Sequence, residues 1–161
     1  MNHPLRTLGT LFLCACFALT LAACDSDGSN DDDNNGGGLG ADVTAVVDGT
    51  TWTATTLSAA GRDEDDTSFG FGGFAADGSS ITVAVQSLTA GTYSTANQDF
   101  VGVYAATSTG IPFTTALGGS GTITVSSITT GRVRGTFSFT ASNGSGTVSV
   151  TSGEFDVAFV D

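Results

Sequence analysis

The sequence contains no lysine, and its one histidine (His3) and all three cysteines lie within the first 24 residues. The chain after Cys24 therefore has no disulfide, no zinc site of cysteine and histidine, and neither Ser-His-Asp nor Cys-His nucleophilic machinery. The absence of lysine excludes Schiff-base chemistry and a phosphate-binding P-loop. We therefore expect no enzymatic activity and no cofactor beyond a covalently attached group.

Basic residues are scarce altogether. The chain has sixteen acidic residues and four arginines, which gives a formal net charge of −12 at pH 7. Such a surface repels the phosphates of nucleic acids and anionic lipid headgroups, so we expect no nucleic-acid partner. It attracts divalent cations or basic partners, and it keeps a protein in solution.

The N-terminus has the pattern of a secretory signal peptide over residues 1–23. Arg6 supplies a positive charge near the start, and residues 8–23, "LGTLFLCACFALTLAA", carry no charge. This run is shorter than the roughly 20 apolar residues of a transmembrane helix, and it ends in small residues. The alternative, a buried core helix, is disfavoured because the acidic, glycine-rich stretch that follows would separate it from any core.

The end of this region together with the next residue, "LAAC" at 21–24, resembles the lipobox of bacterial lipoproteins. The resemblance implies cleavage between Ala23 and Cys24 and a thioether-linked diacylglycerol on Cys24. Each buried methylene of such a lipid contributes about 0.8 kcal/mol, and two or more acyl chains hold a protein stably. The membrane would then be a partner through this lipid alone, and Cys14 and Cys16 would leave with the signal peptide.

Residues 24–41 read as a disordered tether that begins with the lipidated cysteine. The segment "DSDGSNDDDNNGGGLG" has one apolar side chain, too few to offset the entropy lost on ordering. A calcium loop is the alternative, but the regular D-x-D-x-D-G spacing and the closing glutamate are missing. Asp25, directly after the cysteine, resembles an inner-membrane retention signal, whereas "SDGSNDDD" resembles a surface-export signal of Bacteroides-like groups. Of the two, we expect the outer membrane or cell surface.

From residue 42 to 161 the pattern is that of an all-β domain. Short runs alternate apolar with polar residues, as in Ile81–Val85 and Phe137–Phe139, and no segment has a helical face. "DG" at 48–49 and 77–78 and "NG" at 143–144 are hairpin turn signals. We expect about nine or ten strands, connected mostly as an antiparallel meander, in a single sandwich or small barrel. In "FGFGGF" (69–74), a bulge near the last glycines would return Phe74 to the core side.

Carboxylates are the remaining candidates for chemistry. In "RDEDD" (62–66), Asp63, Asp65 and Asp66 are candidate cation ligands, with a solvated hairpin loop as the alternative. Glycoside hydrolysis needs two carboxyl groups that face each other, and no pattern brings Glu64 or Glu154 to a partner.

Three other side chains allow both a structural and a functional interpretation. Trp52, the one tryptophan, alternates with threonines and fits a core anchor better than a ligand platform. Arg132 and Arg134 share a strand face and pair with nearby acids or, alternatively, bind an anion.

Five segments together resemble a domain-of-unknown-function family of bacterial, Bacteroides-group-like lipoproteins. They are "VDGTTWTA" (47–54), "AGTYS" (90–94), "GSGTITVSSI" (119–128), "RVRGTFSFTA" (132–141) and "VTSGEFDVAF" (150–159). The resemblance implies an all-β extracytoplasmic lipoprotein and assigns no catalytic residue.

These observations favour a lipid-anchored envelope protein that serves as a non-catalytic binding or structural module, with a protein or glycan partner left open. One alternative is a carrier of a small hydrophobic ligand inside a β-barrel, which requires a cavity in place of a packed core. A glycoside hydrolase that uses two carboxylates is the other alternative.

Overall fold

The computed structural model describes residues 42–63, 67–107 and 110–159. The predicted signal peptide, the lipobox with Cys24, and the tether lie outside the described residues. In the part that is described there are eleven strands and two short 3₁₀ turns, and none of the helical segments is long and apolar enough to cross a membrane. The strands are β1 (Asp42–Val47), β2 (Thr50–Thr53), β3 (Thr56–Arg62), β4 (Phe69–Phe74), β5 (Ser80–Val85), β6 (Gly91–Ser94), β7 (Phe100–Ala105), β8 (Phe113–Thr114), β9 (Ser120–Ile128), β10 (Arg132–Ser142) and β11 (Thr147–Ala158).

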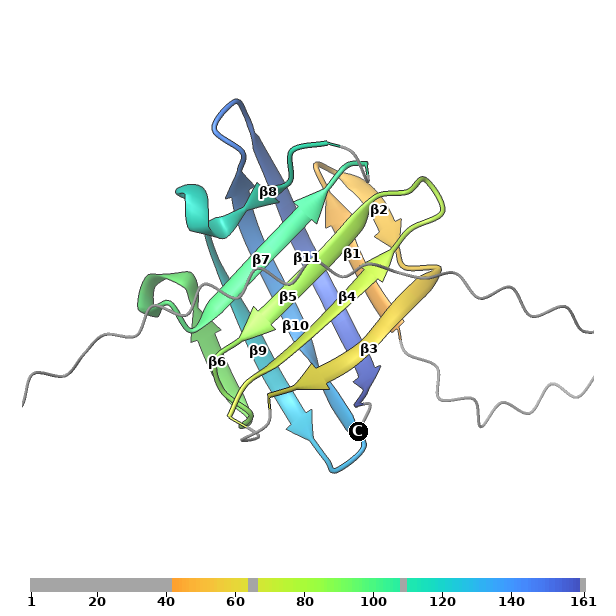
Figure 1. Ribbon diagram of the computed structural model, residues 1–161, viewed down its shortest axis with the longest axis vertical. Coiled ribbons are helices and arrows are strands. Elements are labelled where there is room, and N and C mark those ends of the chain that lie inside the picture. The colour runs from red at the N-terminus through yellow and green to blue at the C-terminus, as the bar shows by residue number, and fades with distance from the viewer. Residues whose placement is uncertain (1–41, 64–66, 108–109, 160–161) are drawn as a thin grey trace, which may run out of the picture. The chain divides into compact units, whose positions relative to one another are not determined.

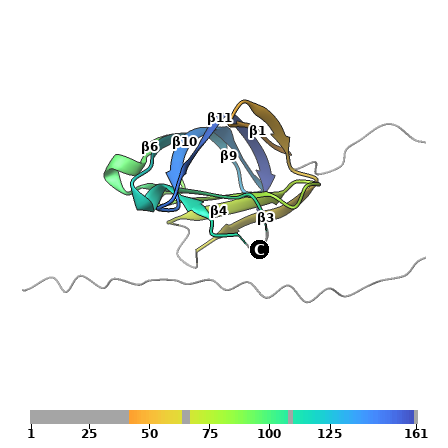
Figure 2. The same cartoon turned by 90° about the horizontal axis from the view of Figure 1, so that it is seen from above.

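All eleven strands belong to one antiparallel sheet that folds back on itself into two layers (Figures 1 and 2). The first layer has the order β2-β1-β11-β10-β9-β6, and the second has the order β3-β4-β5-β7-β8. A single register pair, Ser142 with Thr114, joins β10 to β8 and links the layers at one edge. The strands of the two layers cross at a wide angle in Figure 1, as in an orthogonally packed sandwich.

The predicted all-β fold is confirmed. The structure has eleven strands in place of the expected nine or ten, because short strands such as β6 and β8 are too brief to alternate visibly in the sequence.

The connections are mostly those of a meander, and the "DG" and "NG" signals form the β1–β2, β4–β5 and β10–β11 hairpins. Strand β6 is the exception, because it leaves the second layer and pairs with β9 in the first. Pro112 immediately precedes β8, where its fixed φ and missing N–H cost least.

The space between the layers is filled with side chains. Phenylalanines from both layers pack on one another: Phe71 of β4 stacks on Phe155 of β11 with ring centroids 4.7 Å apart. Phe137 of β10 lies beside both rings, and Phe139 stacks on Phe137. Valine, isoleucine and alanine side chains complete the core. Burial of this apolar surface is the main force that stabilises the fold.

Glycines inside the strands make room for these rings. Gly153 lies directly across from Phe137, and Gly135 directly across from Phe155. A Cβ atom at Gly153 would be 2.6 Å from Cδ2 of Phe137, and one at Gly135 would be 2.7 Å from Cζ of Phe155. Each ring therefore lies over the bare backbone of its neighbour, which is why the sequence pairs glycine with phenylalanine across strands.

The predicted bulge beside Phe74 is wrong. The β4–β5 register runs without interruption from Phe69 to Phe74, and Phe74 points outward with 44% of its surface exposed. Gly73 takes the inward position instead, because a Cβ there would be 3.2 Å from Cη2 of Trp52 and 2.8 Å from Cβ of Ala54. The indole thus occupies the space that a core side chain of β4 would need.

A bulge does occur in β11, which the alternation in the sequence divides into two runs. Val148 and Val150 point inward at even positions, and Phe155 and Val157 point inward at odd positions. Ser152, with a φ of +49°, lies between them, where the register with both neighbouring strands shifts. The extra residue reverses the alternation and keeps one long strand facing the core on both sides of it.

The two ends of the sandwich differ. At one end, which we call the Arg62 end, the guanidinium of Arg62 lies 3.8 Å from the ring centroid of Phe159 and donates to the carbonyl of Thr130 at 2.5 Å. A parallel bridge between Ala60 and Phe159 joins β3 to the end of β11 there. At the opposite end, which we call the Trp52 end, the β1–β2 and β4–β5 turns come from different layers.

Candidate functional site

The acidic loop after β3 is stabilised by its own first carboxylate. Asp63 accepts the amide hydrogens of Thr67 at 2.6 Å and Ser68 at 3.0 Å, and it also accepts the hydroxyl of Thr67. The hydrogen bonds from the Thr67 hydroxyl and the Ser68 amide hold the pKa of Asp63 below its usual value. Asp63 therefore closes the loop as a turn residue, while Glu64, Asp65 and Asp66 lie outside the described residues.

Within the described ranges, no group of three or more Asp, Glu, His or Cys side chains is arranged to hold a metal ion. Cation binding by Asp63 together with Asp65 and Asp66 thus stays a prediction.

The paired arginines bind an acid of the same layer. Nε of Arg132 lies 2.7 Å from Oδ1 of Asp156, and Nε of Arg134 lies 2.8 Å from Oδ2. Partial burial raises the pKa of Asp156, but the hydrogen bonds and positive charges of the two arginines outweigh it and leave the pKa below its usual value. The pairing with a neighbouring acid is therefore confirmed, and Asp156 takes one hydrogen-bond donor, Nε, from each of the two guanidinium groups.

Glu154 lies on the outer face of the first layer. It continues a row of exposed or half-exposed side chains across five strands, formed with Thr44, Thr136, Thr124 and Thr92. A shallow hollow of about 430 Å³ beside it also includes Asp42 and Asp156. Asp156 is bound to two arginines, and the other two acids, Asp42 and Glu154, lie on the same face of the neighbouring strands β1 and β11. No two carboxylates of this hollow therefore face each other from opposite walls of a cleft.

Trp52 belongs to the core, as its alternation with threonine predicts. Only 5% of its surface is exposed. Its indole Nε1–H donates to Oγ of Ser79 at 2.8 Å, and the hydroxyl of Ser79 donates to Oδ1 of Asp77 at 2.6 Å. Ser79 is itself buried, so the chain of hydrogen bonds leads from the core to a carboxylate at the surface.

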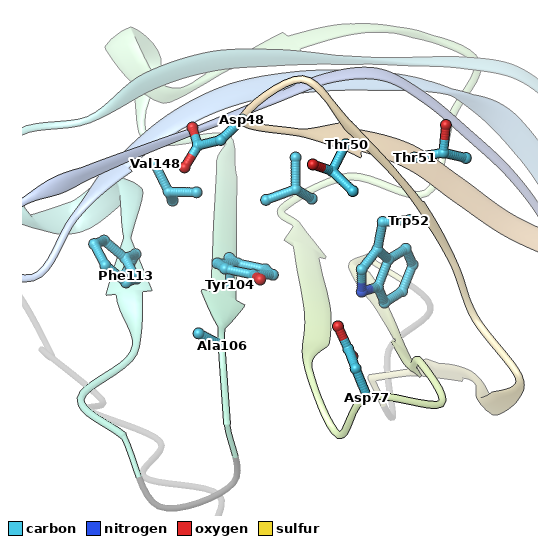
Figure 3. A pocket seen from close by; sticks show the side chains of 10 residues that line it. Asp48, Thr50, Thr51, Trp52, Asp77, Tyr104, Ala106, Phe113 and Val148 are labelled. Carbon is cyan, nitrogen blue, oxygen red and sulfur yellow. The ribbon is translucent and has the colours of Figure 1, made fainter.

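A hollow of about 370 Å³ opens where this series of hydrogen bonds reaches Asp77, and we call it the Trp52 hollow (Figure 3). Aromatic side chains from both layers line it: Trp52 of β2, Tyr104 of β7 and Phe113 of β8. Asp48 enters from the β1–β2 turn and Asp77 from the β4–β5 turn, so the two carboxylates come from opposite layers. The remaining lining residues are Val47, Thr50, Thr51, Ala106 and Val148.

Both carboxylates are held in place through one oxygen. Oδ1 of Asp48 accepts the amide hydrogen of Ser149 at 2.8 Å, and Oδ1 of Asp77 accepts the amide hydrogen of Ser79 at 2.9 Å as well as its hydroxyl. The Ser79 hydroxyl, followed by its amide, holds the pKa of Asp77 below the usual value. Asp77 is therefore negatively charged at neutral pH, in a hollow that no lysine, arginine or histidine lines.

The sequence identifies one residue of this hollow as a candidate, Trp52, and misses the others. Asp48 and Asp77 appear there only as the first residues of "DG" turns, and Ser79 follows the second turn without a distinguishing feature. Strands β1 and β4 finish at the same end of the sandwich, so the turns that follow them come together only once the layers pack.

Comparison with known proteins places the domain in a family. No curated protein and no solved structure gives a significant match. The profile of a domain of unknown function matches residues 41–157, which is nearly the whole β-domain and includes every residue of the Trp52 hollow. The chain therefore belongs to the DUF6252 family of domains of unknown function.

Proposed function

We propose that the protein is a non-catalytic binding module, anchored to the bacterial cell envelope by a lipid on Cys24, and that the Trp52 hollow is its binding site. The anchor is supported by "LAAC" at the end of a signal-like apolar run, followed by a polar, glycine-rich tether. The outer membrane or cell surface is the location that we propose, because an acidic run follows the cysteine closely.

The observation that carries the binding function is the composition of the hollow. It is concave and lined by three aromatic side chains, and it holds a few polar groups fixed by hydrogen bonds, which is the usual make-up of a ligand site. The histidine and cysteine of Ser-His-Asp and Cys-His machinery and the lysine of Schiff-base formation are missing from the sequence beyond Cys24.

A carrier with its ligand inside the sheet is less well supported than a surface site. Phe71, Phe137 and Phe155 from both layers meet in the middle of the domain at centroid distances of 4.7 to 6.3 Å. Rings at these distances are in contact, so a ligand in this place would have to displace them.

The anchor is tested by replacing Cys24 with Ser in the full chain. We expect the variant to incorporate no radiolabelled fatty acid and to leave the detergent phase in a phase-separation assay. Cys16→Ser is the matched control, since this cysteine lies in the same apolar run and should not affect labelling. Fatty-acid labelling that survives in the Cys24→Ser variant would show that the lipid anchor is wrong.

A further inference from the structure

We propose that the Trp52 hollow binds a basic side chain, the ammonium group of a lysine or the guanidinium group of an arginine, displayed by a protein partner. This inference rests on the proposed binding function and names the chemical class of the ligand. It follows from three features of the hollow: the sign of its charge, the carboxylate oxygens left for a ligand, and the way in which its rings are exposed.

The charge at the hollow is negative and has no counterpart inside the domain. Of the basic residues in the described part of the chain, Arg62 lies at the opposite end of the sandwich, and Arg132 and Arg134 bind Asp156. Asp48 and Asp77 therefore line the hollow from opposite layers, and no basic side chain lies among its lining residues. A positively charged ligand supplies this missing partner, whereas an anionic ligand would be repelled.

Each carboxylate keeps an oxygen for a ligand. In both residues Oδ1 accepts the hydrogen bonds from the backbone, and no donor among the described residues reaches Oδ2. The hydrogen bonds to Oδ1 fix the orientation of the groups before a ligand arrives, which lowers the entropic cost of binding. Ammonium and guanidinium groups donate several hydrogen bonds in different directions, which suits a hollow that has carboxylates on more than one side.

The rings fit a basic side chain better than a sugar. A sugar stacks on an exposed ring face, but Trp52 is only 5% exposed. Tyr104 and Phe113 are half-buried, with centroids 6.3 Å apart, and form the apolar wall beside the carboxylates (Figure 3). The methylene stem of lysine or arginine packs on such a wall while its charged group remains at the mouth in contact with water.

The experiment uses the mature, lipidated protein in a nonionic detergent and follows the fluorescence of Trp52, the one tryptophan of the chain. The probes are the capped tripeptides Gly-Arg-Gly and Gly-Lys-Gly, with Gly-citrulline-Gly as a neutral probe of almost the same shape and methyl glucoside as the sugar. We expect saturable titrations with the two basic peptides only. Their affinity should fall about tenfold or more as the salt concentration rises from 20 mM to 500 mM, because the contacts are open to water.

The variants Asp48→Asn and Asp77→Asn remove the charge and keep an amide oxygen as acceptor for Ser149 and Ser79. The Asn side chain also tolerates the positive φ of 47° at residue 48. We expect each variant to weaken the binding of Gly-Arg-Gly about tenfold, as for the loss of one charge-assisted hydrogen bond. Asp99→Asn, at the far end of β7, is the matched control with the same change of charge and should bind as the wild type does.

Other results would contradict the inference. If citrulline binds as tightly as arginine, or if both Asn variants bind normally, the carboxylates do not select a cation. If methyl glucoside binds instead, the ligand class is wrong while the binding function stands. If no probe of any class changes the fluorescence or gives heat in calorimetry, the cation site is wrong, and the anchor still stands or falls with the Cys24→Ser labelling experiment.

Discussion

The Arg62 end and the Trp52 end close the same sandwich in different ways. At the Arg62 end, a guanidinium lies over Phe159 and bonds to the carbonyl of Thr130, and a backbone bridge from Ala60 joins the layers. At the Trp52 end, the indole packs over Gly73 of the other layer, and a chain of hydrogen bonds runs from Trp52 through Ser79 to Asp77. Beyond it the layers leave a hollow.

The difference shows how a chain with few cations distributes them. Arg62 donates a hydrogen bond to a carbonyl and covers a ring, and the two other arginines, Arg132 and Arg134, bind Asp156 on the first layer. The acids at the Trp52 end receive hydrogen bonds only from amides and a hydroxyl. The Arg62 end thus has a positive charge from the domain itself, whereas the carboxylates of the Trp52 end have hydrogen-bond acceptors left for a positively charged ligand.

Removal of the indole should have the largest effect. Trp52→Ala deletes a side chain that is only 5% exposed and that fills the space above Gly73, so we expect the free energy of unfolding to fall by about 3–5 kcal/mol. Urea unfolding followed by circular dichroism measures it. Trp52→Phe, which keeps most of the apolar volume, should cost clearly less. Equal losses in the two variants would mean that the packing of the ring is not what stabilises this end.

Removal of the middle hydroxyl tests the hydrogen-bond chain by itself. Ser79→Ala leaves the buried indole N–H without its acceptor, and we expect a loss of about 1–3 kcal/mol in the free energy of unfolding. The near-ultraviolet circular dichroism of Trp52 should change with it. Ser149→Ala is the control, because this residue bonds to Asp48 through its amide and not through its side chain. A loss of stability in Ser149→Ala as large as that in Ser79→Ala would contradict the role of the hydroxyl.

The Arg62 end should be somewhat less sensitive. Arg62→Met keeps most of the stem but loses the cation over Phe159 and the bond to Thr130, for an expected cost of about 1–2 kcal/mol. Denaturant unfolding measures the change, and Arg134→Met, whose side chain is 57% exposed, is the comparison and should cost under about 1 kcal/mol. A larger effect at Arg134 would mean that the Arg62 end is not held together by its arginine.

Much of the fold can be read from the sequence, because alternation and turn residues are local signals. The inward positions of β5, β9 and β10 and the three hairpins were predictable, as was the burial of Trp52. The direction of Phe74 was not, because the reason lies in the indole of a strand in the other layer. The continuity of β11 was not predictable either, because one extra residue at Ser152 reverses the alternation and makes one strand look like two.

The candidate site was harder to predict than the fold. The pairing of Arg132 and Arg134 with an acid was predictable because residues two apart share a strand face. The Trp52 hollow depends on two turns that are about 30 residues apart in the sequence and meet only when the layers pack, a contact that no local pattern encodes.

The smallest expected effect concerns Asp156, the acid whose charge is neutralised within the domain. Its pKa is lowered in the folded protein, so its ionised form stabilises the fold above about pH 4, and this contribution is lost as the pH falls through the folded-state pKa. Asp156→Asn should therefore cost about 0.2–1 kcal/mol at pH 7, and the difference from the wild type should shrink toward zero as the pH falls through the folded-state pKa. Asp63 and Asp77 also have lowered pKa values, but they are present in both proteins and cancel in the difference. Unfolding curves of the two proteins between pH 2.5 and 7 measure this, and a difference that grows toward acid would show that the arginines do not stabilise the ionised carboxylate.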